Sequence, residues 1–315
     1  MIKESLNIVF AGTPKFAVPT LDLITNSDHN VSLVLTQPDR RAGRGMSMVE
    51  SDVKKYAREK NLQILQPEKI SDSVITQIEK INPDLLVVAA YGIILPANLL
   101  KIFPKGAFNV HGSILPKWRG AAPIQRAIES GDKIIGVSIM EVVEKLDAGR
   151  ICKIYSEERD VTKSSGYYFE RLALKGSELM LDWINLISSN TRVEMVNQDE
   201  SKVTYAKKIF KEEAVIDWNE KAEIINNKVH ALNPNPMARC QFRDRDYKIV
   251  KTKISNIKNM EQYNFGDIYI ESKKLYIKAK ENFLEILELQ PPGSKIISAE
   301  IFIKNYQVKN KEKFS

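Results

Sequence analysis

Hydrophobic and polar positions alternate along the first part of the chain with two different periods. Almost uninterrupted apolar runs, typical of strands covered on both faces, occur at 6–12, 31–36, 62–65, 85–90 and 108–110. Segments with apolar residues at helical spacing lie at 15–25, 53–60, 71–80, 123–129 and 167–187. Two more strand-like runs follow at 134–142 and 151–155. Strand–helix alternation of this kind predicts an α/β fold with an open, mostly parallel sheet.

The pattern changes after a polar stretch at 188–202. Beyond this stretch, one helix-like segment at 217–230 precedes a turn-rich NPNPM sequence. Short strand-like pieces then occur at 247–250, 266–270, 274–277 and 283–289. We therefore predict a first α/β domain over 1–188, a linker over 189–206, and a small β domain, barrel or sandwich, over 207–315.

Charge distinguishes the two predicted domains. The 315-residue chain has a net charge of +7, and residues 207–315 hold 21 Lys and Arg against 15 Asp and Glu. Six of the seven excess charges therefore lie in the last third of the chain. Such a bias fits a phosphate-rich partner, although an ordinary charged surface would show it too.

Composition excludes several classes of site. The two cysteines, Cys152 and Cys240, and the three scattered histidines form no metal-ligand spacing, so we expect no metal site and no disulfide framework. The longest apolar stretch, 85–96, is too short to span a bilayer, and the first residues lack a signal-peptide pattern. These features predict a cytoplasmic protein without a membrane anchor.

Two loops could bind a ligand. The first strand–helix junction, FAGTPKFA, has Gly12 but lacks the GxGxxG pattern of dinucleotide-binding folds, which disfavours a nicotinamide cofactor. The next strand leads into TQPDRRAGRGMSM at 36–48, which places Arg40, Arg41 and Arg44 among glycines. We expect a flexible basic loop there that could hold phosphates, since arginine presents forked donors. A merely solvated loop would have the same composition.

One strand carries the most specific chemistry. Asn109 and His111 stand two residues apart in AFNVHGSILPKWR, so their side chains share one face of the strand. Asp147, in LDAG, comes 36 residues after His111, about one strand–helix–strand unit, and could lie beside the imidazole. An amide donor, an imidazole and a carboxylate suit proton transfer at a polar centre. A core histidine bonded to the backbone is the alternative.

These residues resemble the signature of folate-dependent formyltransferases. The resemblance rests on FNVHGSILPKWRGAAPIQRAI and on LDAG, and it continues in the FAGTPKFAVP opening, the TQPDRRAGRG loop and the NPNPMA segment. Ile114 stands where the family more often has leucine. The resemblance implies a Rossmann-like catalytic domain followed by an OB-like barrel.

The same resemblance implies an activity and roles for residues. Members that act on methionyl-tRNA move the formyl group of 10-formyltetrahydrofolate to the α-amino group of methionine on the initiator tRNA. Asn109, His111 and Asp147 would be catalytic, and Gly112, Ser113, Ile114, Leu115 and Pro116 would line the folate site. Arg40, Arg41 and Arg44 would bind tRNA, with no metal required, and we expect a monomer.

Three rival functions remain open on the sequence. A formyltransferase acting on an amino sugar nucleotide would share the same three polar residues, and a formyl-folate hydrolase would use water instead of an amine. A non-catalytic RNA-binding protein is a third possibility. The arginine-rich segment and the basic last third favour an RNA substrate over a sugar nucleotide.

Overall fold

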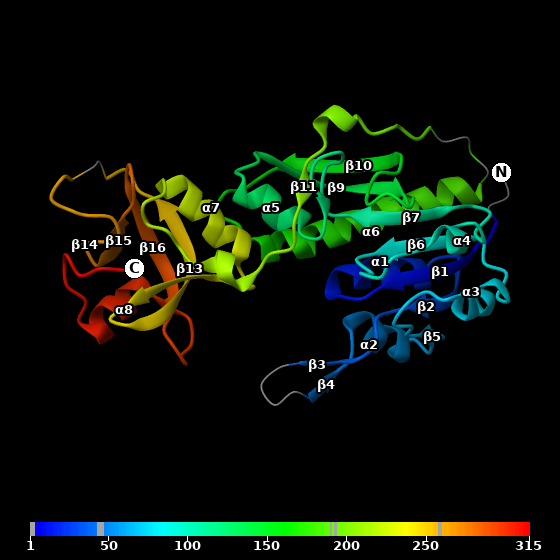
Figure 1. Cartoon of the computed structure of the whole chain (residues 1–315), viewed down its shortest axis with the longest axis horizontal. Coiled ribbons are helices and arrows are strands. Elements are labelled where there is room, and N and C mark those ends of the chain that lie inside the picture. Colours follow the sequence, from blue (N-terminus) through cyan, green and yellow to red (C-terminus); the bar gives the residue numbers. More distant parts are fainter. Residues whose placement is uncertain (1–3, 43–46, 190, 192–193, 258–259) are drawn as a thin grey trace. The chain divides into compact units, whose positions relative to one another are not determined.

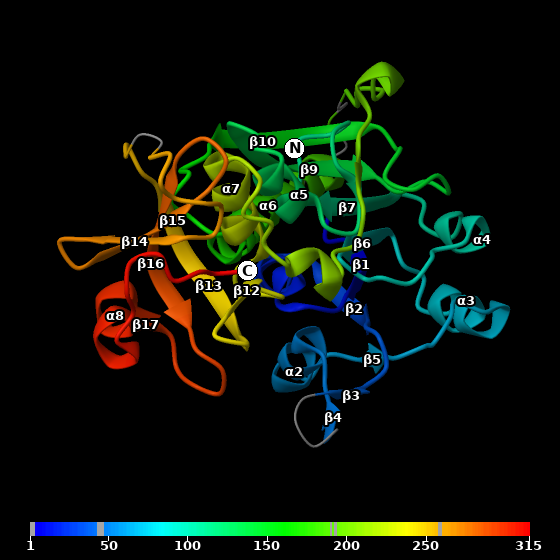
Figure 2. The same ribbon diagram turned by 60° about the vertical axis from the view of Figure 1, so that its left-hand side comes forward.

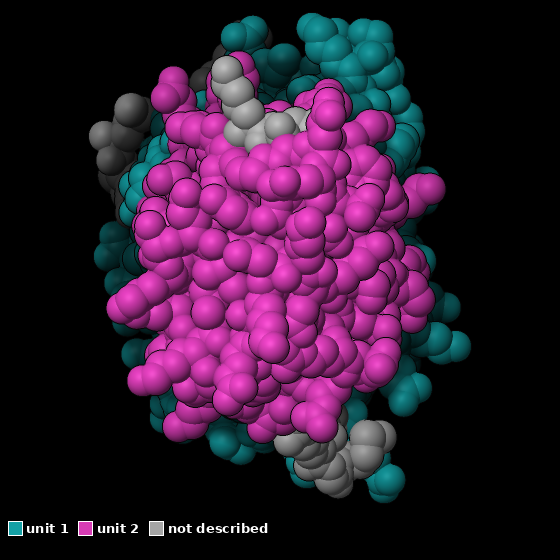
Figure 3. Space-filling view, turned by 90° about the vertical axis from the view of Figure 1, so that its left-hand side faces the viewer, with its two compact units in different colours: residues 1–123, 136–157, 169–206 teal, residues 124–135, 158–168, 207–315 magenta. Residues whose placement is uncertain are grey.

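The structure is a computed structural model that describes residues 4–42, 47–189, 191, 194–257 and 260–315. It divides into two compact units, which Figure 3 shows in different colours. The first contains residues 1–123, 136–157 and 169–206, and the second contains residues 124–135, 158–168 and 207–315. Among the described residues, no helix has the length and apolar character needed to cross a membrane.

A seven-stranded sheet organises the first unit (Figure 1). Its strands, in spatial order, are β10 (Ile151–Glu158), β9 (Ile134–Glu141), β7 (Ala107–His111), β6 (Leu85–Ala89), β1 (Asn7–Gly12), β2 (Asn30–Leu35) and β5 (Ile64–Leu65). The pairings from β7 through β5 are parallel, and β7 pairs with β9 in antiparallel register. The predicted mostly parallel α/β sheet is confirmed.

Helices flank the strands as the apolar periodicity predicts. The unit contains η1 (Lys15–Ala17), α1 (Val18–Thr25), α2 (Asp52–Glu59), α3 (Asp72–Glu79), α4 (Ala97–Leu100) and most of α6 (Ser165–Ser188). Every residue of β6 is buried, because a central parallel strand is covered on both faces. Gly12 ends β1 where a Cβ would lie 2.7 Å from the Cβ of Ala17, so only glycine permits this close approach of strand and helix.

The long helix α6 covers the strand that carries Asn109 and His111. Gly176 of α6 lies so close to the sheet that a Cβ there would be 3.1 Å from Val137 and would also crowd Val110. Phe108 meets Trp183 of the same helix edge-on, with 5.3 Å between ring centroids. Val110 therefore faces α6, and the side chains on either side of it in β7 face the opposite side of the sheet.

The basic segment at 36–48 has more structure than the sequence indicates. Instead of a loop without strands, β3 (Arg40–Ala42) and β4 (Ser47–Val49) pair in antiparallel register. This hairpin projects from the seven-stranded sheet in both views (Figures 1 and 2). The glycine-rich and arginine-rich composition gives this segment a low β propensity, so the two short strands cannot be recognised from the sequence. The hydrogen bonds between β3 and β4 stabilise them.

An antiparallel sheet forms the second unit. Its strands run in the order β12 (Ala238–Phe242), β13 (Arg245–Ile254), β16 (Phe283–Gln290), β15 (Lys274–Lys278) and β14 (Ile268–Glu271), and β17 (Ile297–Ser298) pairs with β16. The helical elements are α5 (Pro123–Glu129, its first residue in the first unit), η3 (Lys211–Ala214), α7 (Ala222–Leu232) and α8 (Ala299–Tyr306). The predicted small β domain is confirmed as an antiparallel β fold.

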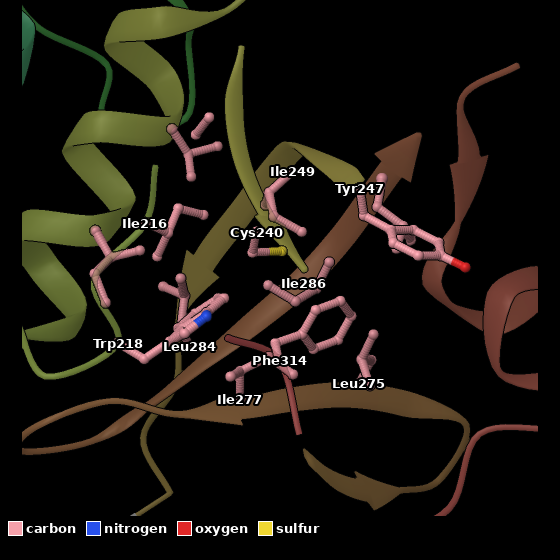
Figure 4. Packing of buried hydrophobic residues seen from close by; sticks show 14 of the residues in the cluster. Ile216, Trp218, Cys240, Tyr247, Ile249, Leu275, Ile277, Leu284, Ile286 and Phe314 are labelled. Atoms are coloured by element: carbon pink, nitrogen blue, oxygen red, sulfur yellow. The ribbon is translucent and has the colours of Figure 1, made fainter. Parts of the chain in front are cut away.

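Alternate residues of these strands form one apolar core (Figure 4). Ile249 of β13, Ile277 of β15 and Ile286 of β16 are almost completely buried and point into it. Phe314 packs against Phe242 with 4.9 Å between ring centroids. An alternating strand pattern buries one face of a sheet in this way while the other face stays polar.

The last residues of the chain link the two edge strands of this sheet. Phe314 forms a bridge to Phe242 of β12, and Lys313 forms one to Asp267, just before β14. Among the described residues no ladder pairs β12 directly with β14, so the C-terminal segment lies between these two edges and pairs with both. It therefore satisfies backbone groups that two open edges would expose.

The predicted helix at 217–230 begins later than the apolar spacing indicates. The α-helix starts at Ala222, because Asp217 accepts a hydrogen bond from the backbone N–H of Asn219 at 2.9 Å and makes a turn instead. Ser71 precedes α3, but its hydroxyl pairs with the Ser73 hydroxyl at 2.9 Å and makes no capping bond.

Candidate active site

Strand β7 ends at the candidate site and presents Asn109 and His111 on one face. His111 is buried, with 5% of its side chain exposed, and Asn109 is half-buried. Within the described part of the chain, the Asn109 amide forms no hydrogen bond with another protein group. An amide that is held on a rigid strand and free of protein partners can donate to a substrate oxygen.

The backbone fixes the His111 ring. Its Nε2 lies 2.9 Å from the carbonyl oxygen of Trp118, and because a carbonyl oxygen only accepts, the Nε2–H donates this hydrogen bond. The other ring nitrogen, Nδ1, lies 3.7 Å from Oδ2 of Asp147. That distance exceeds a hydrogen bond but permits attraction between a protonated ring and the carboxylate. Nδ1 is thus the ring atom that can exchange a proton.

Asp147 follows strand β9 on a tightly constrained turn. Its Oδ2 accepts a hydrogen bond from the backbone N–H of Gly120 at 2.8 Å, and 14% of its side chain is exposed. Its backbone has φ = 48°, a left-handed conformation that costs a non-glycine residue about 1 kcal/mol. Gly149 closes the turn, since a Cβ there would overlap the carbonyl oxygen of Glu141. His111 and Asp147 thus lie close together, as their spacing in the sequence predicts.

The loop after β7 uses most of its side chains for its own structure. Ser113 Oγ donates to the carbonyl oxygen of Lys117 at 2.6 Å, and Ser138 Oγ bridges the Ser113 carbonyl and the Leu115 N–H at 2.7 and 3.1 Å. Leu115 is buried, and Ile114 is half-buried. Of the residues expected to line a folate site, Ser113 and Leu115 therefore use these groups to hold the loop itself.

The basic hairpin is anchored at its base by Asp39. Asp39 forms an ion pair with Lys54 at 2.6 Å and accepts a hydrogen bond from Gln66 at 2.9 Å. These hydrogen bonds from Lys54 and Gln66 lower the pKa of Asp39. Arg40 and Arg41 are exposed beyond this anchor. Arg44, the third arginine that the sequence singles out, lies outside the described residues.

Sequence reasoning missed a polar network behind the Asp147 turn. Arg119 is fully buried and donates to Gln198 from Nε at 3.0 Å and from Nη2 at 2.8 Å. Gln198 in turn donates to the backbone of the Asp147 turn. Arg119 belongs to the motif KWRG, but its partner follows 79 residues later in a polar stretch that has no distinctive pattern.

The described histidines, cysteines and carboxylates do not meet the requirements of a metal site. In the ranges that the structure describes, no three of these side chains are grouped so as to hold an ion.

Comparison with known families settles the class of this protein. A family model described as formyl transferase matches residues 6–184, and one described as formyl transferase, C-terminal domain, matches residues 208–307. The chain belongs to the formyl transferase family. The resemblance to folate-dependent formyltransferases, inferred from the β7 motif and LDAG, is confirmed at the level of the family.

Curated relatives of the chain have one name in common. Methionyl-tRNA formyltransferase of Coxiella burnetii is 42% identical over 306 residues, 95% of each chain. The protein of the same name in Methylobacillus flagellatus is 42% identical, with 95% of this chain and 96% of the relative covered. The one in Neisseria meningitidis is 37% identical over 94% of this chain and 96% of the relative.

Solved structures share the fold at lower sequence identity. HypX from Aquifex aeolicus, crystallised with tetrahydrofolic acid, aligns with a TM-score of 0.65 at 15% identity. The alignment covers 98% of this chain and 49% of HypX. An N-formyltransferase from Helicobacter canadensis, in complex with folinic acid and dTDP-3-aminofucose, gives a TM-score of 0.63 at 18% identity over 89% of this chain and 98% of its own.

Proposed function

We propose that this protein transfers the formyl group of 10-formyltetrahydrofolate to the α-amino group of methionyl initiator tRNA. The observation that carries the proposal is the approach of Asp147 to His111 beside Asn109, at the end of the strand that bears the family motif. Membership of the formyl transferase family and the shared name of near full-length relatives support the choice of substrate.

The three side chains suit the chemistry of formyl transfer. The amine attacks the formyl carbon, the bond from that carbon to N10 of the folate breaks, and a proton passes from the amine to N10. Negative charge builds on the formyl oxygen, where the free amide of Asn109 donates a hydrogen bond. Loss of one such donor typically costs about 10²–10³-fold in rate.

His111 and Asp147 manage the proton. Trp118 holds Nε2 of His111, so a protonated ring donates from Nδ1, beside the reacting centre and the Asp147 carboxylate. Asp147 stabilises that protonated ring and accepts the amine proton, directly or through a water molecule. The N–H of Gly120 holds the carboxylate in place for both tasks.

Folate and tRNA would occupy different parts of the first unit. Residues 112–116, which adjoin His111, line the folate site. The hairpin of β3 and β4 presents Arg40 and Arg41 to the acceptor end of the tRNA. A tRNA contact by Arg44, which lies outside the described residues, stays a prediction. Action as a monomer stays a prediction.

Incubation with competing acceptors tests the function. The purified chain receives 10-formyltetrahydrofolate with methionyl initiator tRNA, with an amino sugar nucleotide, or with water alone, and mass spectrometry follows the acceptor and the folate. We expect formyl-methionine from the tRNA and little product from the other two. Formylation of the sugar nucleotide alone, or release of formate without an acceptor, would assign the chain to a rival function.

The salt dependence of tRNA binding tests the hairpin. Replacement of Arg40 or Arg41 by alanine should weaken binding and reduce the slope of log affinity against log salt by about one for each lost phosphate contact. Lys80→Ala is a matched control, because Lys80 is an exposed cation of the first unit at the end of α3, a helix that is given no role in tRNA binding. A hairpin variant with an unchanged slope contradicts a phosphate contact.

A further inference from the structure

Residues 196–206, part of the segment predicted to be a linker, form hydrogen bonds beside the Asp147 turn. Val196 pairs with Ile151 in both directions, at 2.8 and 2.9 Å, just after the Asp147 turn. Tyr205–Ala206 forms strand β11, which runs parallel to Arg119–Gly120, strand β8. A short 3₁₀ helix, η2 (Glu200–Lys202), lies between these two attachments. Residues 196–206 are therefore attached to β10 just after the Asp147 turn and to β8.

Gln198 is the residue of this segment that contacts the Asp147 turn. Its Nε2 donates to the carbonyl oxygens of Asp147 at 2.9 Å and of Gly149 at 2.7 Å. Its Oε1 accepts both hydrogen bonds from Arg119. Both N–H groups of the amide nitrogen are thus directed at the carbonyl oxygens of Asp147 and Gly149.

Arg119 fixes the orientation of that amide. Its side chain is fully buried, and its charge is balanced by Glu200 at 2.8 Å, which also binds Lys145 at 2.8 Å. The hydrogen bond from Arg119 and then that from Lys145 lower the pKa of Glu200 to about 2, so Glu200 is ionised at neutral pH. Because a guanidinium only donates, Gln198 must present its oxygen to Arg119 and its nitrogen to the turn.

This arrangement stabilises the backbone conformation of Asp147. The left-handed φ of Asp147 needs support from its surroundings, and Gln198 supplies it through the carbonyl of Asp147 itself. The same conformation aims Oδ2 at the Gly120 N–H and at His111 Nδ1. A change in the peptide at 147 would therefore move the carboxylate relative to the imidazole.

We propose that Gln198, oriented by Arg119, is a positioning residue for formyl transfer that sets the place of the Asp147 carboxylate beside His111. The proposal rests on the proposed function and assigns Gln198 no contact with substrate. It follows that the segment joining the two units contributes directly to catalytic geometry.

Gln198→Glu separates positioning from structural support. Glutamate keeps two acceptors for Arg119 but offers no N–H, so its oxygens face the carbonyls of Asp147 and Gly149. We expect kcat to fall on the order of 10–100-fold, with KM for folate and tRNA and the urea midpoint close to wild type. Gln198→Ala should show the same fall in kcat. Asp199→Asn is the matched control, since among the described residues the Asp199 side chain bonds Ser201 and Lys202 of η2, and it should keep wild-type kcat.

A double-mutant cycle shows whether the effect passes through Asp147. If Gln198 acts by placing that carboxylate, Gln198→Ala should cost almost nothing further in kcat when Asp147 is already alanine. An equal loss in both backgrounds, or a Gln198→Glu variant with wild-type kcat, overturns this inference while the proposed function stands. A wild-type chain that transfers no formyl group overturns the proposed function as well.

Discussion

His230 should make the second unit lose stability as the pH falls. It lies in α7 and is buried, and within the described structure neither ring nitrogen has a hydrogen-bond partner. Burial first, and then the charges of Arg159 and Lys251, lower its pKa to about 4, while Asp160 acts weakly in the opposite direction. The folded chain thus keeps this histidine neutral at a pH where the unfolded chain has already protonated it.

The sign and size of the effect follow from linkage. The ordinary pKa of histidine is 6.5, so between about 6.5 and 4 the unfolded state binds a proton that the folded state does not. Stability falls across this window as the pH falls, and the loss levels off once the folded His230 is protonated as well. The full gap corresponds to about 3 kcal/mol, of which about 2 kcal/mol is lost between about pH 7 and about pH 5.

Hydrogen exchange can measure this loss in the second unit alone. Peptides from α7 are followed by mass spectrometry in the wild type and in His230→Leu, at about pH 7 and about pH 5. Comparison at equal pH cancels the intrinsic exchange rates and the other titrations. We expect the free energy of unfolding of His230→Leu, relative to that of the wild type, to be about 2 kcal/mol higher at about pH 5 than at about pH 7. Lys251→Met, which removes one of the cations, should reduce the wild-type loss.

An equal change in stability between the two pH values in the wild type and in His230→Leu would refute this reasoning. It would mean that the unfolded and folded chains protonate His230 over the same range, and that its burial does not exclude the charged form.

Further predictions concern packing and the two thiols. Gly136→Ala should destabilise the first unit by about 1–3 kcal/mol in urea unfolding, because a Cβ there overlaps the carbonyl oxygen of Tyr155, and an unchanged midpoint contradicts this. Leu284→Ala should cost about 2–5 kcal/mol by creating a cavity in the core of the second unit, and a loss below about 1 kcal/mol would place Leu284 outside that core. Burial raises the pKa of Cys152 to about 12 and that of Cys240 still further, so neither thiol should react quickly with a thiol reagent until the chain unfolds. Fast labelling of the native protein contradicts that prediction.

Local patterns encode the features that the sequence predicts correctly. The apolar run of β6 identifies a central strand because burial on both faces excludes polar residues. The period of two places Asn109 and His111 on one face of β7, and the spacing from His111 to Asp147 fits a single strand–helix–strand unit. These relations depend on near neighbours or on one supersecondary unit, so they can be read without knowledge of the remaining fold.

The features that the sequence conceals depend on distant partners. Arg119 and Gln198 are separated by 79 positions, and either residue alone has the composition of a surface loop. Phe314 pairs with an edge strand of the second unit from a charged tail that has no strand-like pattern in the sequence. The left-handed backbone of Asp147 is equally hidden, because aspartate occurs in many ordinary turns and only its surroundings select this one.

The single-turnover rate of formyl transfer in Asn109→Ala tests whether the Asn109 amide stabilises the reacting formyl oxygen. With enzyme in excess over methionyl initiator tRNA and saturating 10-formyltetrahydrofolate, the rate reports chemistry rather than binding or product release. Asn98→Ala is the matched control, since that asparagine bonds Asp72 on the same unit away from β7. We expect the single-turnover rate to fall about 10²–10³-fold in Asn109→Ala and to stay at the wild-type value in Asn98→Ala. A wild-type rate for both variants would contradict the claim that the amide at the end of β7 stabilises the reacting formyl oxygen.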